Sequence, residues 1–245
     1  MYYKTIIDKD DEMANMIRDI YLESDCRYGY RKIGKELRFN NIKINFKKVL
    51  RIMRDIGLKG SYPRRNINTS KADKEHKIYP YLLESLCINR PNQVWATDIT
   101  YINISGKFVY FIAIIDLHSR YILSKNLSTI MDAKFCIEAL RKALEKNKPE
   151  IFNTDQGSQF TSEDFTSELR KADVKISMDH KGRCFDNIII ERFWRTLKQE
   201  AIYFYRPNNI EELELVLEDF IGWYNYKRRH QSLEYKMPAE IYYGN

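Results

Sequence analysis

Apolar residues recur along this chain with two different periods, and the change between them divides the chain into two parts. In the first part, the apolar positions repeat at helical spacing. The helices that this spacing predicts cover residues 10–21, 30–39 and 46–56. The pair Asn40-Asn41 makes a turn before the third helix, which Asn45 can cap. From residue 90 onwards, apolar and polar residues alternate as in strands.

The second part begins with three strand-like segments joined by short turns, and then alternates helices with strands. The predicted strands cover residues 94–103, 107–120, 121–129, 150–155 and 174–178. The predicted helices cover residues 132–147, 162–172, 187–200 and 210–225. This order resembles that of ribonuclease-H-like folds, so we expect an α/β domain with a mixed five-stranded sheet flanked by helices. In such a fold the first and fourth strands lie side by side.

Composition and charge agree with this division. Hydrophobic residues make up 44% of the 245 residues, which is enough for a sizeable core. The stretch at 61–88 is polar and basic and lacks periodicity, so we expect a linker there. We therefore predict a helix-turn-helix domain at 1–60, this linker, a ribonuclease-H-like core at 89–205, and a helical extension at 206–245.

The positive charge is concentrated in the first third of the chain. Residues 1–77 contain 19 Lys and Arg against 11 Asp and Glu, whereas residues 78–245 contain 22 against 23. A basic module joined to a near-neutral one is typical of a DNA-binding arm on a catalytic or scaffold domain. The third helix carries the residues we expect to touch DNA: Lys47, Lys48, Arg51 and Arg54. The alternative is a three-helix bundle whose basic face is simply solvated.

No apolar run approaches the length of a membrane span, and the first residues do not form a signal peptide. These observations predict a cytosolic protein. The four cysteines are too widely spaced to suggest a disulfide framework or a Cys-rich zinc site. His180 and His230 are expected to face DNA or solvent rather than a metal.

Three acidic residues are placed where the predicted fold can bring them together. Asp98 is the lone acid of an apolar strand, where a carboxylate is costly unless it is paired or bound to metal. Asp155 follows the fourth strand, and Glu191 lies on the helix at 187–200. Such carboxylates can hold two Mg²⁺ ions for phosphoryl transfer between DNA strands. Taken singly, each acid could be a surface or capping carboxylate; Asp116 is a rival acid that we interpret as a turn carboxylate.

The helix that carries Glu191 also carries basic and apolar residues. Arg195 and Lys198 follow Glu191 by four and seven residues on the same helix face, where they could hold DNA phosphates. The opposite side is expected to pack in the core through Phe193, Trp194 and Leu197.

Several longer motifs resemble a known family. They are YGYRKIGKEL, PNQVWATDITYI, DLHSRYIL, NTDQGSQFTS, KGRCFDNIIIERFWRTLKQE and YNYKRRHQSLEYKMPAE, and they span about residues 27–240. Together they are similar to the OrfB product of the insertion-sequence-three family of bacterial transposases, which has a retroviral-integrase-like DDE core. Asn153-Thr154 and Asn187-Ile188 depart from the residues that the family often has at these positions.

The resemblance implies a catalytic triad of Asp98, Asp155 and Glu191, with Mg²⁺ as cofactor and Mn²⁺ as a substitute. It also implies double-stranded DNA as substrate, copies of the chain assembled on paired element ends, and fusion to or association with an upstream OrfA product. The expected function is therefore that of a transposase. The alternatives are a catalytically silent DNA-binding regulator derived from a transposase, and a ribonuclease H or junction nuclease.

Overall fold

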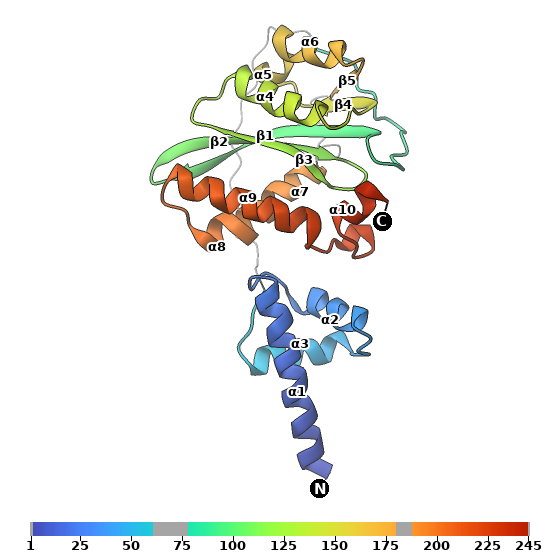
Figure 1. Ribbon diagram of the computed structural model, residues 1–245, viewed down its shortest axis with the longest axis vertical. Coiled ribbons are helices and arrows are strands. Elements are labelled where there is room, and N and C mark those ends of the chain that lie inside the picture. Colours follow the sequence, from blue (N-terminus) through green and yellow to red (C-terminus); the bar gives the residue numbers. More distant parts are fainter. Residues whose placement is uncertain (1, 61–77, 180–187, 245) are drawn as a thin grey trace. The chain divides into compact units, whose positions relative to one another are not determined.

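A computed structural model of the chain contains two compact units, residues 1–65 and 66–245. The structure describes residues 2–60, 78–179 and 188–244. Among the described residues, the first unit contains helices and no strand, and the second is built around one sheet (Figure 1). This agrees with the predicted fold class.

The first unit is a bundle of three helices with a short turn between the second and the third. The helices are α1 (Tyr2–Glu23), α2 (Tyr30–Phe39) and α3 (Phe46–Asp55). Asn45 caps α3 as predicted, because its side chain accepts a hydrogen bond from the N–H of Lys47 at 2.9 Å. Helix α1 begins earlier than its apolar period suggested. The buried faces of the helices meet through Ile17, Ile33, Leu37, Val49, Ile52 and Met53.

The second unit contains a mixed five-stranded sheet in the order β3-β2-β1-β4-β5. Its strands are β1 (Val94–Ile104), β2 (Lys107–Asp116), β3 (Ile122–Ser128), β4 (Ile151–Thr154) and β5 (Lys175–Met178). The first three are antiparallel, whereas β4 runs parallel to both β1 and β5. The predicted neighbourhood of the first and fourth strands is therefore confirmed.

Helices cover both faces of this sheet (Figure 1). On one face lie α4 (Ala133–Leu144), α5 (Ser158–Thr161) and α6 (Glu163–Lys171). On the other lie α7 (Ile188–Leu197), α8 (Tyr203–Tyr205) and α9 (Ile210–Tyr226), with α10 (Pro238–Tyr243) near the end of the chain. Each face buries its own apolar layer, which explains why the central strands β1 and β2 are apolar on both sides.

The predicted continuous helix at 187–200 is wrong in one respect. Helix α7 ends at Leu197, and a π-helical turn follows at Lys198–Ile202 before α8 begins. The wider turn keeps Ala201 and Ile202 buried. At the same turn, Glu200 accepts two hydrogen bonds from the Arg228 guanidinium, at 2.7 and 2.8 Å. A pairing partner so distant in the sequence cannot be anticipated from apolar periodicity.

The part of the predicted linker that can be described, residues 78–88, contains no helix. It packs along the outer strand β5, where the N–H of Leu82 donates to Ser177 Oγ at 3.0 Å. The cysteines within the described ranges, Cys26, Cys87 and Cys136, are all free. None of the helices in the described part of the chain is long and apolar enough to cross a membrane.

Candidate active site

Asp98 lies where strands β1 and β4 part. Their parallel ladder runs from Val94 opposite Ile151 to Ala96 opposite Asn153, and Asp98 comes two residues after its end. Just past that end, the backbone N–H of Ile99 donates to Asp98 Oδ1 at 2.8 Å. The carboxylate is therefore held by the backbone of its own strand, at the edge where β4 turns away.

The second oxygen of Asp98 is held by helix α7. Trp194 Nε1 donates to Asp98 Oδ2 at 2.9 Å, while the indole ring packs edge-on against Phe111 with ring centroids 5.7 Å apart. Trp194 is buried as predicted, but its bond to Asp98 was not foreseen. The signal in the sequence is that a buried indole N–H needs an acceptor. Trp194 lies three residues after Glu191, so the two side chains are neighbours on the helix, and the expectation that Trp194 lies on the opposite side from Glu191 is wrong.

Asp155 immediately follows β4, beyond Thr154. The N–H of Gly157 donates to Asp155 Oδ1 at 2.9 Å. A Cβ atom at position 157 would also lie 2.9 Å from that oxygen, which is too close, so glycine is required for the carboxylate to keep this position. Burial raises the pKa of Asp155, and the Gly157 hydrogen bond opposes that rise.

Electrostatics link the three predicted acids. Burial is the main reason that the pKa of Asp98 is raised to about 7, and the neighbouring carboxylates of Asp155 and Glu191 add to the rise. Glu191 lies in the first turn of α7 and is exposed. The structure thus brings Asp98 and Asp155 together, with Glu191 at the margin of the same site.

Asp98, Asp155 and Glu191 are not arranged as a preformed metal site. Within the described ranges, no group of three His, Cys, Asp or Glu side chains has the spacing of a metal site. Carboxylates without a cation between them repel one another, which agrees with the raised pKa of Asp98. The available donors are all carboxylate oxygens, and a hard divalent cation such as Mg²⁺ fits that set.

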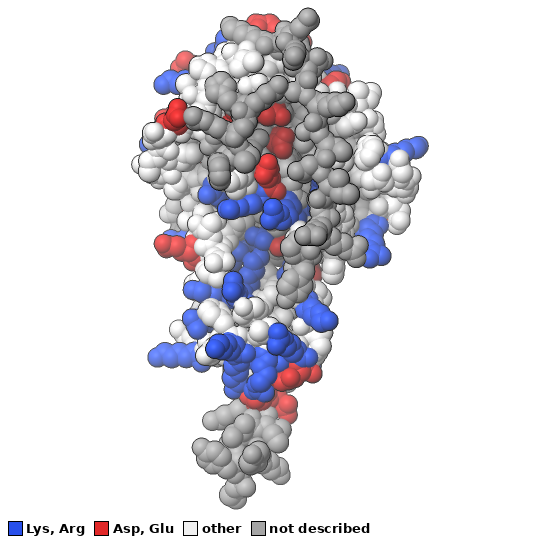
Figure 2. Space-filling view, turned by 180° about the vertical axis from the view of Figure 1, so that it is seen from behind, with Lys and Arg blue, Asp and Glu red and all other residues white. Residues whose placement is uncertain are grey.

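Basic side chains lie next to these acids. Lys198 Nζ lies 5.1 Å from the centre of the Tyr101 ring. Burial lowers the pKa of Lys198, while Tyr101 and Asp98 act in the opposite direction. Arg195 is exposed on α7. Figure 2 shows acidic side chains gathered in the middle of one face of the second unit, with basic side chains directly beside them.

A further carboxylate at this edge of the sheet escaped the sequence analysis. Asp179 follows β5, is buried, and accepts a hydrogen bond from Asn153 Nδ2 at 2.9 Å. Its backbone oxygen accepts one from Gln156 Nε2 at 2.8 Å. Because Asn153 and Gln156 stand on either side of Asp155, Asp179 helps to fix the turn that carries Asp155. It comes directly after the apolar strand pattern that ends at Met178, so the pattern itself does not mark it as buried.

Two other expectations have clear outcomes. Asp116 is a buried turn carboxylate, as interpreted, because it accepts hydrogen bonds from the N–H of Asn92 and from the N–H and hydroxyl of Ser119, each at 2.7 Å.

His230 was expected to face DNA or solvent, and this is wrong. It is buried, and its ring contacts that of Tyr224 with centroids 4.7 Å apart. His180 lies outside the described residues.

In the first unit, two of the four predicted DNA-binding residues already have an acidic partner. Asp10 of α1 accepts from Lys48 Nζ at 2.7 Å and from the Arg51 guanidinium at 2.6 Å. Lys47 and Arg54, on the same helix, are exposed. The basic face of α3 is therefore partly neutralised by its own bundle.

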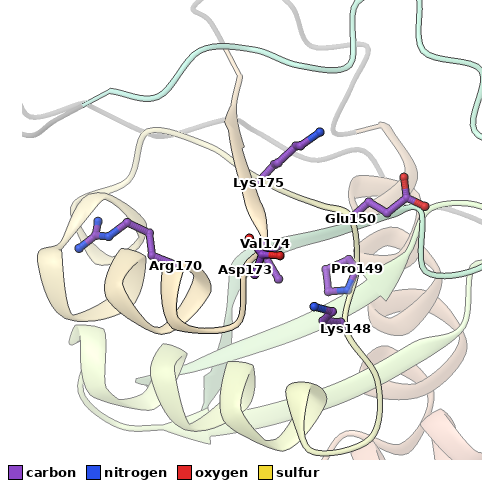
Figure 3. A pocket seen from close by; sticks show the side chains of 7 residues that line it. All are labelled: Lys148, Pro149, Glu150, Arg170, Asp173, Val174 and Lys175. Carbon is purple, nitrogen blue, oxygen red and sulfur yellow. The ribbon is translucent and has the colours of Figure 1, made fainter.

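A surface hollow in the second unit lies away from Asp98 and Asp155. It is found at the ends where β4 and β5 begin, and it is lined by Lys148, Pro149, Glu150, Arg170, Asp173, Val174 and Lys175 (Figure 3). Asp155, by contrast, follows the end of β4. Glu150 at the rim is paired with Arg90 at 2.6 Å. This hollow is not part of the candidate site.

Comparison with known proteins gives matches over nearly the whole chain. Residues 8–66 match an HTH-like domain, and residues 88–184 and 172–238 match models of an integrase core domain. The chain is 32% identical to a transposase for the insertion sequence element IS904 of Lactococcus lactis, over 94% of this chain and 92% of that protein. It is also 32% identical to transposase InsF for insertion sequence IS3A of Escherichia coli, over 86% of this chain and 75% of that protein.

A solved structure of similar fold is that of the HTLV-2 integrase catalytic core domain in complex with magnesium. The TM-score is 0.52 and the identity 20%, over 62% of this chain and 97% of that one. At this identity the likeness concerns the fold, and it supports the ribonuclease-H-like arrangement of the sheet.

The raised pKa of Asp98 predicts a pH-dependent stability. Because the folded pKa of about 7 lies above the usual value of 3.8, the folded state binds a proton that the unfolded state releases between these pH values. Stability of the metal-free protein should therefore fall as pH rises through this window. Asp98→Asn should remove the fall and be more stable than the parent by roughly 2–4 kcal/mol at pH 8, with no advantage near pH 4.

The measurement is urea unfolding of both proteins from pH 4 to pH 8 in the presence of a chelator. Asp164→Asn is the matched control, because Asp164 is exposed on α6. Equal stability of Asp98→Asn and the parent at pH 8 would contradict the prediction.

The ion pairs of Asp10 give a second prediction. Asp10→Asn should release Lys48 and Arg51 for DNA phosphates and strengthen binding of the full chain to DNA by roughly two- to fivefold at low salt. Asp11→Asn removes the same charge from the neighbouring, exposed position. Fluorescence anisotropy with labelled duplex DNA measures both variants, and an equal gain in the two would show that net charge alone is responsible.

Proposed function

Because this chain belongs to the IS3 family of insertion-sequence transposases, we propose that it cuts and joins DNA strands by phosphoryl transfer at Asp98, Asp155 and Glu191. The observation that carries this proposal is the crowding of carboxylates at a buried position: burial first, and the charges of Asp155 and Glu191 second, raise the pKa of Asp98 to about 7. Such crowding is unfavourable in the protein alone and is relieved by a bound cation.

The three carboxylates would hold divalent cations, with Mg²⁺ as the natural cofactor and Mn²⁺ as a substitute. We place Asp98 between the other two and expect two ions. When bound, such ions activate the attacking oxygen and stabilise the leaving oxygen of the phosphate. The attacking group would be water for strand cleavage and a DNA 3′-hydroxyl for strand transfer.

The protein's own contribution would be to orient these carboxylates before DNA arrives. Each oxygen of Asp98 accepts one hydrogen bond, from Ile99 or from Trp194, and keeps a lone pair for a cation. Gly157 holds one oxygen of Asp155 in the same way. Groups fixed in advance need not be reordered in the reaction, which lowers its barrier.

DNA would be delivered by basic residues in both units. The HTH-like unit supports DNA as its partner, and we assign phosphate contacts there to Lys47, Lys48, Arg51 and Arg54. Beside the acids, we assign such contacts to Arg195 and Lys198. Because two element ends must be brought together, copies of the chain would assemble on paired ends. An upstream OrfA product, fused or separate, would add to the recognition of those ends.

Cleavage of element ends tests this function directly. The full chain, alone and fused to its upstream reading frame, is incubated with labelled DNA carrying the element's own ends and Mg²⁺ or Mn²⁺. We expect nicking at the element boundary, and Asp155→Asn should reduce it at least a hundredfold because a cation ligand is lost. Asp164→Asn should retain activity. Binding without cleavage, under both metals and in both forms, would favour the silent regulator instead.

The hydrogen bond from Trp194 predicts a positioning role. Trp194→Phe keeps a ring against Phe111 but removes the N–H, so cleavage should fall by roughly tenfold, the effect of one hydrogen bond to a charged group. The Mg²⁺ concentration for half-maximal stabilisation against heat should also rise. Trp95→Phe is the matched control, because the buried Trp95 indole donates to Asn92 Oδ1 at 3.0 Å. Equal losses in both variants would argue for a general packing effect.

A further inference from the structure

The outer half of the β1–β2 hairpin carries exposed aromatic rings. In the strand register Tyr101 lies opposite Tyr110 and Asn103 lies opposite Phe108, so Tyr101 and Phe108 form a diagonal pair on one face of the sheet. Their rings meet edge-on with centroids 5.4 Å apart. They remain 46% and 53% exposed, so a large part of each side chain is accessible to solvent.

Further from the hairpin turn, helices cover the sheet face that carries Tyr101 and Phe108. There Trp95, Ile112 and Ile114 are fully buried in the core beneath the helices, and Tyr110 is partly buried against that core. The hairpin extends past α4 (Figure 1). Tyr101 and Phe108 therefore stand where helix cover ends, and the fold does not use them as core residues.

The hairpin holds these rings in a fixed place. Its tight turn uses Ser105 and Gly106, both at positive φ, and Ser105 Oγ donates to the backbone oxygen of Asn208 at 2.9 Å. This contact ties the tip of the hairpin to the loop before α9. A rigid aromatic surface binds a flat ligand with little loss of conformational entropy.

The aromatic pair is continuous with the candidate active site. Lys198 Nζ lies 5.1 Å from the Tyr101 ring centre and interacts electrostatically with Asp98. Along β1, Asp98 and Tyr101 are three residues apart, about 10 Å, and their side chains leave opposite faces of the strand, so Lys198 is the group that links them. One lysine thus stands between the aromatic rings and the carboxylates, where the phosphate of a bound nucleotide would need a positive charge.

We propose that Tyr101 and Phe108 form a stacking platform for unpaired nucleobases of the DNA strand that enters the active site. Every base presents a flat face, so aromatic rings beside a cation bind single strands with little sequence preference. The platform would keep a strand end separated from its complement while its phosphate lies at the acids. This inference rests on the proposed function, because it takes DNA as the ligand of that site.

The test uses the full chain carrying Asp155→Asn, without divalent metal, so that binding is measured apart from cleavage. The probes are a blunt duplex of the element end and the same duplex with a short single-stranded flank containing 5-iodouracil. Tyr101→Leu and Phe108→Leu remove one ring each, and Tyr101→Phe keeps the ring. Tyr203→Leu is the matched control, because Tyr203 on α8 has a similar exposure of 44%.

We expect the two platform variants to bind the flanked duplex about tenfold more weakly, with less than a twofold change on the blunt duplex. Tyr101→Phe and Tyr203→Leu should bind both DNAs like the parent. Light-induced cross-links from 5-iodouracil should map to the peptides that contain Tyr101 or Phe108.

Equal weakening on both DNAs, or unchanged binding with cross-links elsewhere, would overturn the platform and leave the proposed function standing. So would a change in sedimentation of the DNA-free variants, because the face would then be a contact between copies of the chain. A parent protein that binds neither DNA, both alone and fused to its upstream reading frame, would overturn the proposed function, and the platform with it.

Discussion

The second unit must keep the carboxylate of Asp98 in a partly buried position close to that of Asp155. Burial and the neighbouring charges both oppose ionisation there, as the raised pKa shows. The surrounding structure compensates with donors fixed by the fold: the N–H of Ile99 on β1 and the indole of Trp194 on α7. Strand pairing, the position of α7 and the packing of Trp194 on Phe111 together produce this arrangement.

The features that could be predicted from the sequence are those that depend on residues close together along the chain. The alternation of apolar residues gave the strands, and the order of strands and helices gave the sheet and the neighbourhood of Asp98 and Asp155. Capping by Asn45 could be predicted because a side-chain oxygen just before a helix can accept a hydrogen bond from a backbone N–H of the first turn. The family followed from motifs spread along the chain, which are specific because several occur together in order.

The features that were missed are contacts between residues far apart in the sequence. Trp194 looks like any core aromatic until its partner on β1 is known. Lys48 and Arg51 look like free bases until α1 places Asp10 beside them. Asp179 and the π-helical turn at Lys198–Ile202 likewise depend on tertiary neighbours, and period-based reasoning has no access to those.

The pairing of Glu200 with Arg228 bears on the fate of damaged copies of the element. Both side chains are nearly buried, at 13% and 11% exposure, and Arg228 follows Glu200 by 28 residues. Removal of one partner from such a pair typically costs a few kcal/mol, a large part of the stability of a domain. A gene copy cut short before Arg228 would therefore encode a poorly folded product.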